Sequence, residues 1–146
     1  MGVSIKESTL DFSANNGHVN GVSGYVYSTV PVVIHAWLTN PRDYRAAVTS
    51  VIKCGGDADT TAAIVGGIVG TTMGETGIPQ DWISGICDWP RSVNWLRRLG
   101  SQLSDSLEAD TKKKPLSLNF AATLLRNIVF VGVVLMHGFR RLLPPY

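Results

Sequence analysis

Hydrophobic residues recur at helical spacing from residue 28 to the end of the chain, and no segment alternates apolar and polar residues as a strand does. The pattern predicts helices over about 28–39, 41–54, 59–73, 81–86, 91–107 and 118–143. The predicted fold class is therefore all-α, a helical bundle.

The predicted helix boundaries rest on capping and breaking residues. Ser28 or Thr29 is expected to cap the first helix, and Pro31 suits a first turn. Gly55 and Gly56 end the second helix. Residues 1–24 are polar and rich in glycine and asparagine, which predicts a loop. We therefore expect a flexible segment over 1–20 and one domain over 21–146.

The two C-terminal helices are predicted to bury their apolar residues. In the segment 91–107 the residues expected to face inward are Val93, Leu96, Leu99, Leu103 and Leu107. The last helix has a run free of charged and amide side chains only over Ile128–Met136, with Arg126 and Asn127 before it. A membrane span needs about 20 apolar residues. The run favours a buried or partner-docking helix, so no membrane contact is expected.

The 146 residues suffice for one domain, but their charge is uneven. Residues 1–90 carry four Lys or Arg against eight Asp or Glu, whereas residues 91–146 carry nine against three. No aromatic residues alternate with the basic ones, so no nucleic-acid-binding motif is predicted. The first residues lack the pattern of a signal peptide, and we expect a cytoplasmic protein. Cys54 and Cys87 are expected to be buried, reduced thiols.

The segment Gly55–Thr60, Gly-Gly-Asp-Ala-Asp-Thr, carries the strongest chemical signal. The simplest interpretation makes Asp57 and Asp59 a helix cap and a first-turn residue that favours the helix dipole. However, two nearby carboxylates repel each other unless a cation neutralises them. Together with the Thr60 hydroxyl they form the oxygen donor set that Mg²⁺ or Mn²⁺ prefers. The segment therefore also suggests a metal site.

The helix behind these carboxylates is unusually rich in small residues. Each interior glycine costs about 0.8–1 kcal/mol relative to alanine, so close packing is expected to offset the cost. We expect backbone-to-backbone packing and a helix surrounded by others. The small residues share one side of the helix and are Ala63, Gly66, Gly67, Gly70 and Gly74.

The segment from Gly55 to Trp82 resembles the C-terminal part of the ADP-ribosylglycohydrolase family. The family pattern Gly-Gly-Asp-x-Asp-Thr is matched at Gly55–Thr60, and the small-residue helix and Gly-x-x-x-Ile-Pro-x-x-Trp follow, the latter at Gly74–Trp82. The segment from Ser23 resembles the family's preceding loop and helix, and the resemblance covers about 21–146.

The resemblance implies an all-α hydrolase that uses two Mg²⁺ or Mn²⁺ ions to remove ADP-ribose from a modified protein or a small molecule. It implies that Asp57, Asp59 and Thr60 are metal ligands, and that Gly24 and Tyr25 line the ADP-ribose pocket. Gly55, Gly56, Gly66 and Gly70 match structural positions. The resemblance assigns no catalytic acid or base in this chain.

Two departures from the family pattern stand out. Members of the family have a further Thr-Asp-Asp ligand cluster in an N-terminal half, which this chain lacks, and Ser28 stands where relatives often carry His. We therefore expect the chain to hold half of the site and to be inactive alone, needing a missing N-terminal half or self-association. The alternative is a non-catalytic helical fragment, or a metal-binding or interaction module that needs a partner half.

Histidine and tryptophan offer no second site. His35 lies in an apolar stretch and is expected to be a core histidine, and Trp82, Trp89 and Trp95 are expected to pack in the core.

Overall fold

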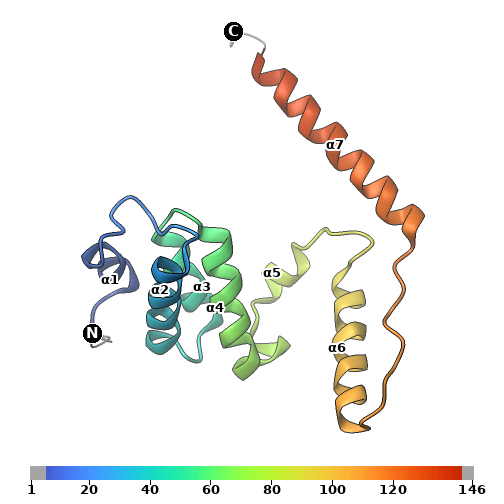
Figure 1. Cartoon of the computed structure of the whole chain (residues 1–146), viewed down its shortest axis with the longest axis horizontal. Coiled ribbons are helices and arrows are strands. Elements are labelled where there is room, and N and C mark those ends of the chain that lie inside the picture. Colours follow the sequence, from blue (N-terminus) through green and yellow to red (C-terminus); the bar gives the residue numbers. More distant parts are fainter. Residues whose placement is uncertain (1–5, 143–146) are drawn as a thin grey trace. The chain divides into compact units, whose positions relative to one another are not determined.

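The computed structural model describes residues 6–142, and in that part of the chain the regular elements are all helices (Figure 1). This confirms the all-α prediction. The described elements are α1 (Thr9–Asn15), α2 (Val26–Thr39), α3 (Tyr44–Lys53), α4 (Ala58–Met73), the 3-10 turn η1 (Glu75–Gly77), α5 (Gln80–Ser84), α6 (Val93–Glu108) and α7 (Phe120–Leu142).

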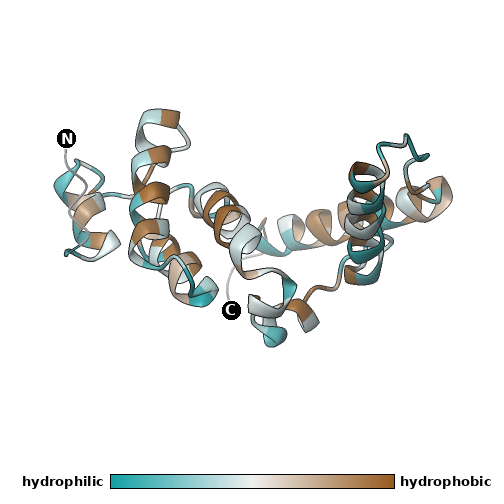
Figure 2. Ribbon diagram, turned by 90° about the horizontal axis from the view of Figure 1, so that it is seen from below, coloured by the Kyte–Doolittle hydropathy of each residue, from teal (hydrophilic) through white to brown (hydrophobic). Residues whose placement is uncertain are grey.

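The chain divides into two compact units, one over Met1–Trp82 and one over Ile83–Tyr146. The expected boundary near residue 20 does not separate them. The candidate site lies in the first unit, whose helices α1 to α4 pack against one another. Hydrophobic and hydrophilic residues are interspersed along the helices, which is the pattern of elements that bury only part of their surface (Figure 2).

The core of the first unit forms where α2, α3 and α4 meet. The valines at 32, 33, 51, 65 and 69 and the alanines at 36 and 47 are almost completely buried. Most of these positions follow from the helical periodicity, because each helix buries the side on which its apolar residues recur. Ile52, although apolar and next to the buried Val51, is 48% exposed.

The N-terminal segment is more ordered than predicted. Ser8 caps α1, its side chain accepting a hydrogen bond from the Asp11 N–H at 3.1 Å. Phe12 is buried and stacks on the His35 ring with 4.3 Å between centroids. The prediction of a loop here is wrong for Thr9–Asn15, because Thr9, Phe12 and Ser13 are buried and hold this helix on its neighbours. His35 is fully buried, as expected of a core histidine.

Helix α2 begins earlier than predicted. Its N-cap is Tyr25, so neither Ser28 nor Thr29 caps it, and Pro31 lies inside the helix instead of in its first turn. Thr29 instead donates its hydroxyl to the carbonyl of Ser23 at 2.9 Å. This bond ties the first turn of α2 to the loop before it.

The segment after α4 is fastened to α3. Arg45 Nη2 lies 2.5 Å from Asp81 Oδ1, and its guanidinium lies over the Trp82 ring, 4.8 Å from the centroid. Tyr44 meets Trp82 edge to face, with 6.1 Å between centroids. Trp82 is partly buried and packs against the core, as expected.

The second unit buries little of its apolar surface. Leu96, Leu103 and Leu107 are exposed, so three of the five residues expected to face inward in α6 do not. The reason is that the chain returns along the other side of α6, where Gln102 Nε2 donates to the Lys114 carbonyl at 2.6 Å. Trp89 is 52% exposed and Cys87 is exposed, so both were wrongly expected to be buried, whereas Cys54 is buried as predicted.

Helix α7 has no buried residue, so of the two alternatives expected for it the buried helix is wrong, whereas the partner-docking helix stays a prediction. It is long and apolar enough to cross a membrane by length and composition, a test that the core helices of soluble proteins also pass.

Candidate functional site

Two glycine-containing turns lie against each other at the N-terminal end of α4. The Val22 N–H donates to the Gly55 carbonyl at 3.1 Å, and the Asp57 N–H donates to the Val22 carbonyl at 2.7 Å. Val22 and Gly56 thus form an isolated parallel bridge, and the Val22 side chain is completely buried. The loop before α2 therefore fixes the position at which α4 begins.

Only glycine fits two positions of this contact. Gly56 has φ +74°, and a Cβ there would lie 2.2 Å from the Val22 carbonyl oxygen. Gly21 has φ +106°, and a Cβ there would lie 2.5 Å from the Gly56 nitrogen. Both φ values lie in the region that L-residues rarely adopt. Gly56 was predicted to be structural, whereas Gly21 was missed because it lies among other loop glycines.

Asp57 and Asp59 lie at the start of α4, as predicted. Asp57 occupies the N-cap position, yet its side chain makes no capping hydrogen bond. In contrast, Ser8 and Asp43 both accept capping bonds at the starts of α1 and α3. The Asp57 carboxyl is therefore not used as a helix cap, which removes the simplest explanation for its presence.

The carboxyl groups of Asp57 and Asp59 are close enough to share a hydrogen bond. This hydrogen bond lowers the pKa of the Asp59 carboxyl, and hydrogen bonds from the N–H groups of Thr60 and Asp59 lower it further. Asp59 and Thr60 are both exposed, so the pair is open to solvent.

Gly24 lies beside this pair. The Asp57 Oδ2 atom occupies the space of a Cβ at Gly24, 2.3 Å from where that atom would be. Tyr25 follows as the N-cap of α2, is 64% exposed, and lies against Tyr27 with 5.4 Å between ring centroids. The structure thus brings the predicted substrate-binding loop to the predicted metal-binding carboxylates.

The small residues of α4 serve side-chain packing. A Cβ at Gly66 would lie 2.8 Å from the Tyr44 hydroxyl, and one at Gly70 would lie 3.7 Å from the Tyr44 ring. The expected backbone-to-backbone packing is therefore replaced by a tyrosine ring against the helix. A Cβ at Gly67 would meet nothing within 4 Å, and Ala63 is exposed. Hence α4 is not surrounded on all sides by the described residues.

The residues present match part of a hard-metal site. Two carboxylates and the Thr60 hydroxyl are suitable oxygen donors for Mg²⁺ or Mn²⁺. No group of three or more His, Cys, Asp or Glu side chains that could hold a metal occurs among residues 6–142. These ions take about six oxygen ligands, so the two carboxylates and the hydroxyl could fill only part of their coordination.

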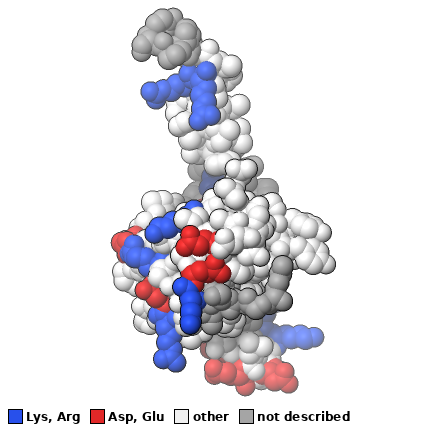
Figure 3. Space-filling model, turned by 90° about the vertical axis from the view of Figure 1, so that its left-hand side faces the viewer, with Lys and Arg blue, Asp and Glu red and all other residues white. Residues whose placement is uncertain are grey.

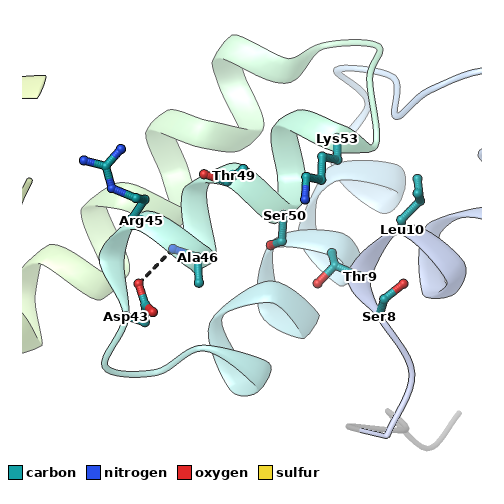
Figure 4. A pocket seen from close by; sticks show the side chains of 9 residues that line it. All are labelled: Ser8, Thr9, Leu10, Asp43, Arg45, Ala46, Thr49, Ser50 and Lys53. Atoms are coloured by element: carbon teal, nitrogen blue, oxygen red, sulfur yellow. Dashed lines mark hydrogen bonds between the residues drawn. The ribbon is translucent and has the colours of Figure 1, made fainter.

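A separate hollow of about 550 Å³ lies between the start of α1 and the outer side of α3 (Figure 4). The Asp43 carboxylate on its edge accepts the capping hydrogen bond from the Ala46 N–H at 2.9 Å. None of the predicted site residues lines it. The hollow therefore does not belong to the candidate site.

A comparison with known families identifies the family to which this chain belongs. The sequence model of the ADP-ribosylglycohydrolase family matches residues 5–113, which include both glycine turns and all of α4. The chain belongs to the ADP-ribosylglycohydrolase family. This confirms the resemblance that the Gly55–Thr60 segment carries.

Individual relatives agree with this assignment. The chain is 34% identical to the ADP-ribosyl-[dinitrogen reductase] glycohydrolase of Rhodospirillum rubrum over an alignment of 62 residues, which covers 42% of this chain and 21% of that protein. It is 31% identical to an ADP-ribosylarginine hydrolase of Serratia proteamaculans over 77 residues, which cover 53% of this chain and 21% of that protein. An ADP-ribosylarginine hydrolase of Pseudomonas putida is 28% identical over 83 residues, which cover 57% of this chain and 21% of that protein.

The matched part of this ADP-ribosylglycohydrolase family member spans about a fifth of the length of these relatives. No solved structure matches the chain.

Proposed function

We propose that this chain supplies one half of the metal site of an enzyme that hydrolyses the bond between ADP-ribose and a modified acceptor. The observation that carries the proposal is the pair Asp57 and Asp59. The two side chains interact at the start of α4, the Asp57 carboxyl makes no capping hydrogen bond, and both residues lie within the region that the family model matches.

In this proposal each predicted site residue has a defined task. Asp57, Asp59 and Thr60 hold Mg²⁺ or Mn²⁺ through their side-chain oxygens, and Gly24 and Tyr25 line the space for ADP-ribose. Gly24 suits that task because its missing side chain leaves room for Asp57 Oδ2. When bound, the cation supplies charge that orients ribose hydroxyls and activates water for attack at the anomeric carbon.

The remaining ligands are proposed to come from protein outside residues 6–142. Residues 6–142 offer two clustered carboxylates, which leave most of the coordination of a hard cation to be filled. A second acidic cluster could belong to a further segment or to a partner chain. This chain alone is therefore proposed to be inactive, and no residue in it is assigned as the catalytic acid or base.

The substrate class follows from the names of the relatives. One is a glycohydrolase of ADP-ribosylated dinitrogen reductase, and two are ADP-ribosylarginine hydrolases. We propose an ADP-ribosylated protein or small molecule as the substrate, with ADP-ribosylarginine as the first compound to test.

The test measures release of ADP-ribose from ADP-ribosylarginine in the presence of Mn²⁺. We expect no release by the chain alone. We expect release when it is co-expressed with the part of the Rhodospirillum rubrum relative that it does not match, and none when the chain carries Asp59→Asn. Asp43→Asn, which keeps a capping side chain on α3, is the matched control.

Turnover by the chain alone that Asp59→Asn abolishes would contradict the half-site. Failure of the co-expressed wild-type pair, shown by co-purification to form a complex, would favour the non-catalytic alternative.

A further inference from the structure

The C-terminal part of the chain combines an exposed apolar helix with an exclusively basic set of charges. Residues 111–146 contain six Lys or Arg and no Asp or Glu. Three of them, Lys112, Lys113 and Lys114, precede α7, and Arg140 and Arg141 lie in its last turn. None of this belongs to the proposed metal site, which lies in the other unit.

The polar side chains of α7 share one side of the helix. Arg126, His137, Arg140 and Arg141 stand at i, i+11, i+14 and i+15, which places them close to one another around a helix of 3.6 residues per turn. Large apolar residues occupy the opposite side, at Phe120, Leu124, Ile128, Val131, Leu135 and Phe139, and all are between 50% and 79% exposed. The division is clearest toward the two ends of α7, because over Ile128–Met136 apolar residues occur on every side of the helix.

The contacts that α7 makes within its unit leave this apolar side open. Arg126 pairs with Asp88 at 3.1 Å, and a hollow next to Asp88 and Trp89 is lined by Leu125, Arg126, Val129, Phe130 and Val133 of α7. These residues lie on the basic side or beside it. In Figure 3 the projecting part of α7 is mostly white, with the blue of basic residues near its C-terminal end and no red of acidic residues.

We infer that α7 binds an anionic lipid membrane by lying in the plane of its surface. In that position the side with Ile128 and Val131 enters the acyl boundary, and the basic side faces the headgroups, as in amphipathic membrane anchors. Each Lys or Arg near such a surface adds to the attraction. This inference replaces the expectation that the chain has no membrane contact.

Charge distribution favours a helix in the surface plane over one that spans the bilayer. The 23 residues of α7 extend about 34 Å, which matches a bilayer core of about 30 Å. A span, however, would place Arg126 and Asn127 inside the hydrocarbon and separate the three lysines from Arg140 and Arg141 on opposite sides. An in-plane helix keeps all the basic residues at one anionic leaflet.

The test is co-sedimentation of the full chain with vesicles of phosphatidylcholine, alone or mixed with phosphatidylglycerol. We expect binding to the mixed vesicles only, and weaker binding at high salt because salt screens the attraction. Two valines on opposite sides of α7 give matched variants. Val131→Asp should weaken binding at least about tenfold relative to Val133→Asp, because only the first places a carboxylate in the lipid.

Three results would overturn the inference. If both variants lose binding equally, and the wild-type chain stays on the vesicles after alkaline carbonate extraction, α7 spans the bilayer. No vesicle binding, together with self-association that Val131→Asp removes, would assign the apolar side to a second copy of the chain. If the chain binds neither to vesicles nor to a second copy of itself, the apolar side would be assigned to another protein. Circular dichroism of both variants checks that α7 remains helical.

Discussion

The contact between Gly21, Val22 and Gly56 determines where the carboxylates of the candidate site lie. It joins two loops by backbone hydrogen bonds at 2.7 and 3.1 Å and has no room for a side chain on either glycine. Because Asp57 donates one of these bonds through its own N–H, any shift of Gly56 moves the start of α4. Gly21 and Gly56 therefore determine the position of the carboxylates, although neither glycine is itself a proposed metal ligand.

Gly56→Ala is expected to destabilise the first unit by at least about 2 kcal/mol, because it combines a positive φ with a clash against Val22. Gly67→Ala serves as its control. At that position in α4 nothing lies within 4 Å of an added Cβ, so the substitution should stabilise the unit by about 0.5–1 kcal/mol. Urea denaturation followed by circular dichroism measures both, and a loss of stability in Gly67→Ala equal to that in Gly56→Ala would contradict this account.

At this scale the sequence identified the residues of the site more readily than their roles. Asp57, Asp59 and Thr60 could be found because two carboxylates on a glycine turn at a helix start are a distinctive pattern. That Asp57 does not cap α4 could not be foreseen, since Asp at this position usually does. The role of Gly21 depends on a partner loop that is distant in sequence, which no local pattern reveals.

At the scale of elements, α1 is attached to the first unit by few side chains. Phe12 is 8% exposed and stacks on His35, whereas Leu10, on the same helix, is 48% exposed. We expect Phe12→Ala to cost about 3 kcal/mol, because it leaves a cavity between α1 and α2. Leu10→Ala should cost less than about 1 kcal/mol. Equal effects of the two variants in thermal unfolding would show that α1 is not docked as described.

Long helices with strong periodicity were predicted within a few residues of their observed ends, as α3, α4 and α6 illustrate. The failures involve elements whose surroundings decide the outcome. A single phenylalanine gives α1 no periodicity to detect. The inward side of α6 was misassigned because the returning chain, and not the leucine pattern, determines which side is covered.

The ion pair between Arg45 and Asp81 gives the segment after α4 a dependence on pH. The Arg45 guanidinium lowers the pKa of the Asp81 carboxyl below its usual 3.8. A group with a lowered pKa stabilises the folded state above its unfolded pKa, and this contribution disappears as the pH falls through the folded pKa. The Asp81 side chain is exposed, so the effect should be small.

We therefore expect Asp81→Asn to be slightly less stable than the wild type near neutral pH. The difference should vanish as the pH falls below about 3.8. Urea midpoints measured across that range check this. A difference that grows toward acid pH would contradict the ion pair.

At the scale of the whole molecule, the chain belongs to the ADP-ribosylglycohydrolase family but matches only about a fifth of the length of the relatives compared. The first unit has its own core of α2, α3 and α4, and it carries the carboxylate pair. The second unit contributes an exposed helix whose features indicate a membrane surface. The fold class could be read from periodicity, whereas the division into two units could not, because it depends on which helices meet.

The most direct test of the central claim is a calorimetric titration of the chain with Mn²⁺. We predict saturable binding that Asp57→Asn and Asp59→Asn each weaken at least about tenfold, because each removes one anionic ligand from a small donor set. Asp43→Asn, which changes a carboxylate of the same unit that caps α3, should bind as the wild type does. No binding of Mn²⁺, or binding that the Asp57 and Asp59 variants leave unchanged, would contradict the assignment of these two carboxylates as a metal half-site.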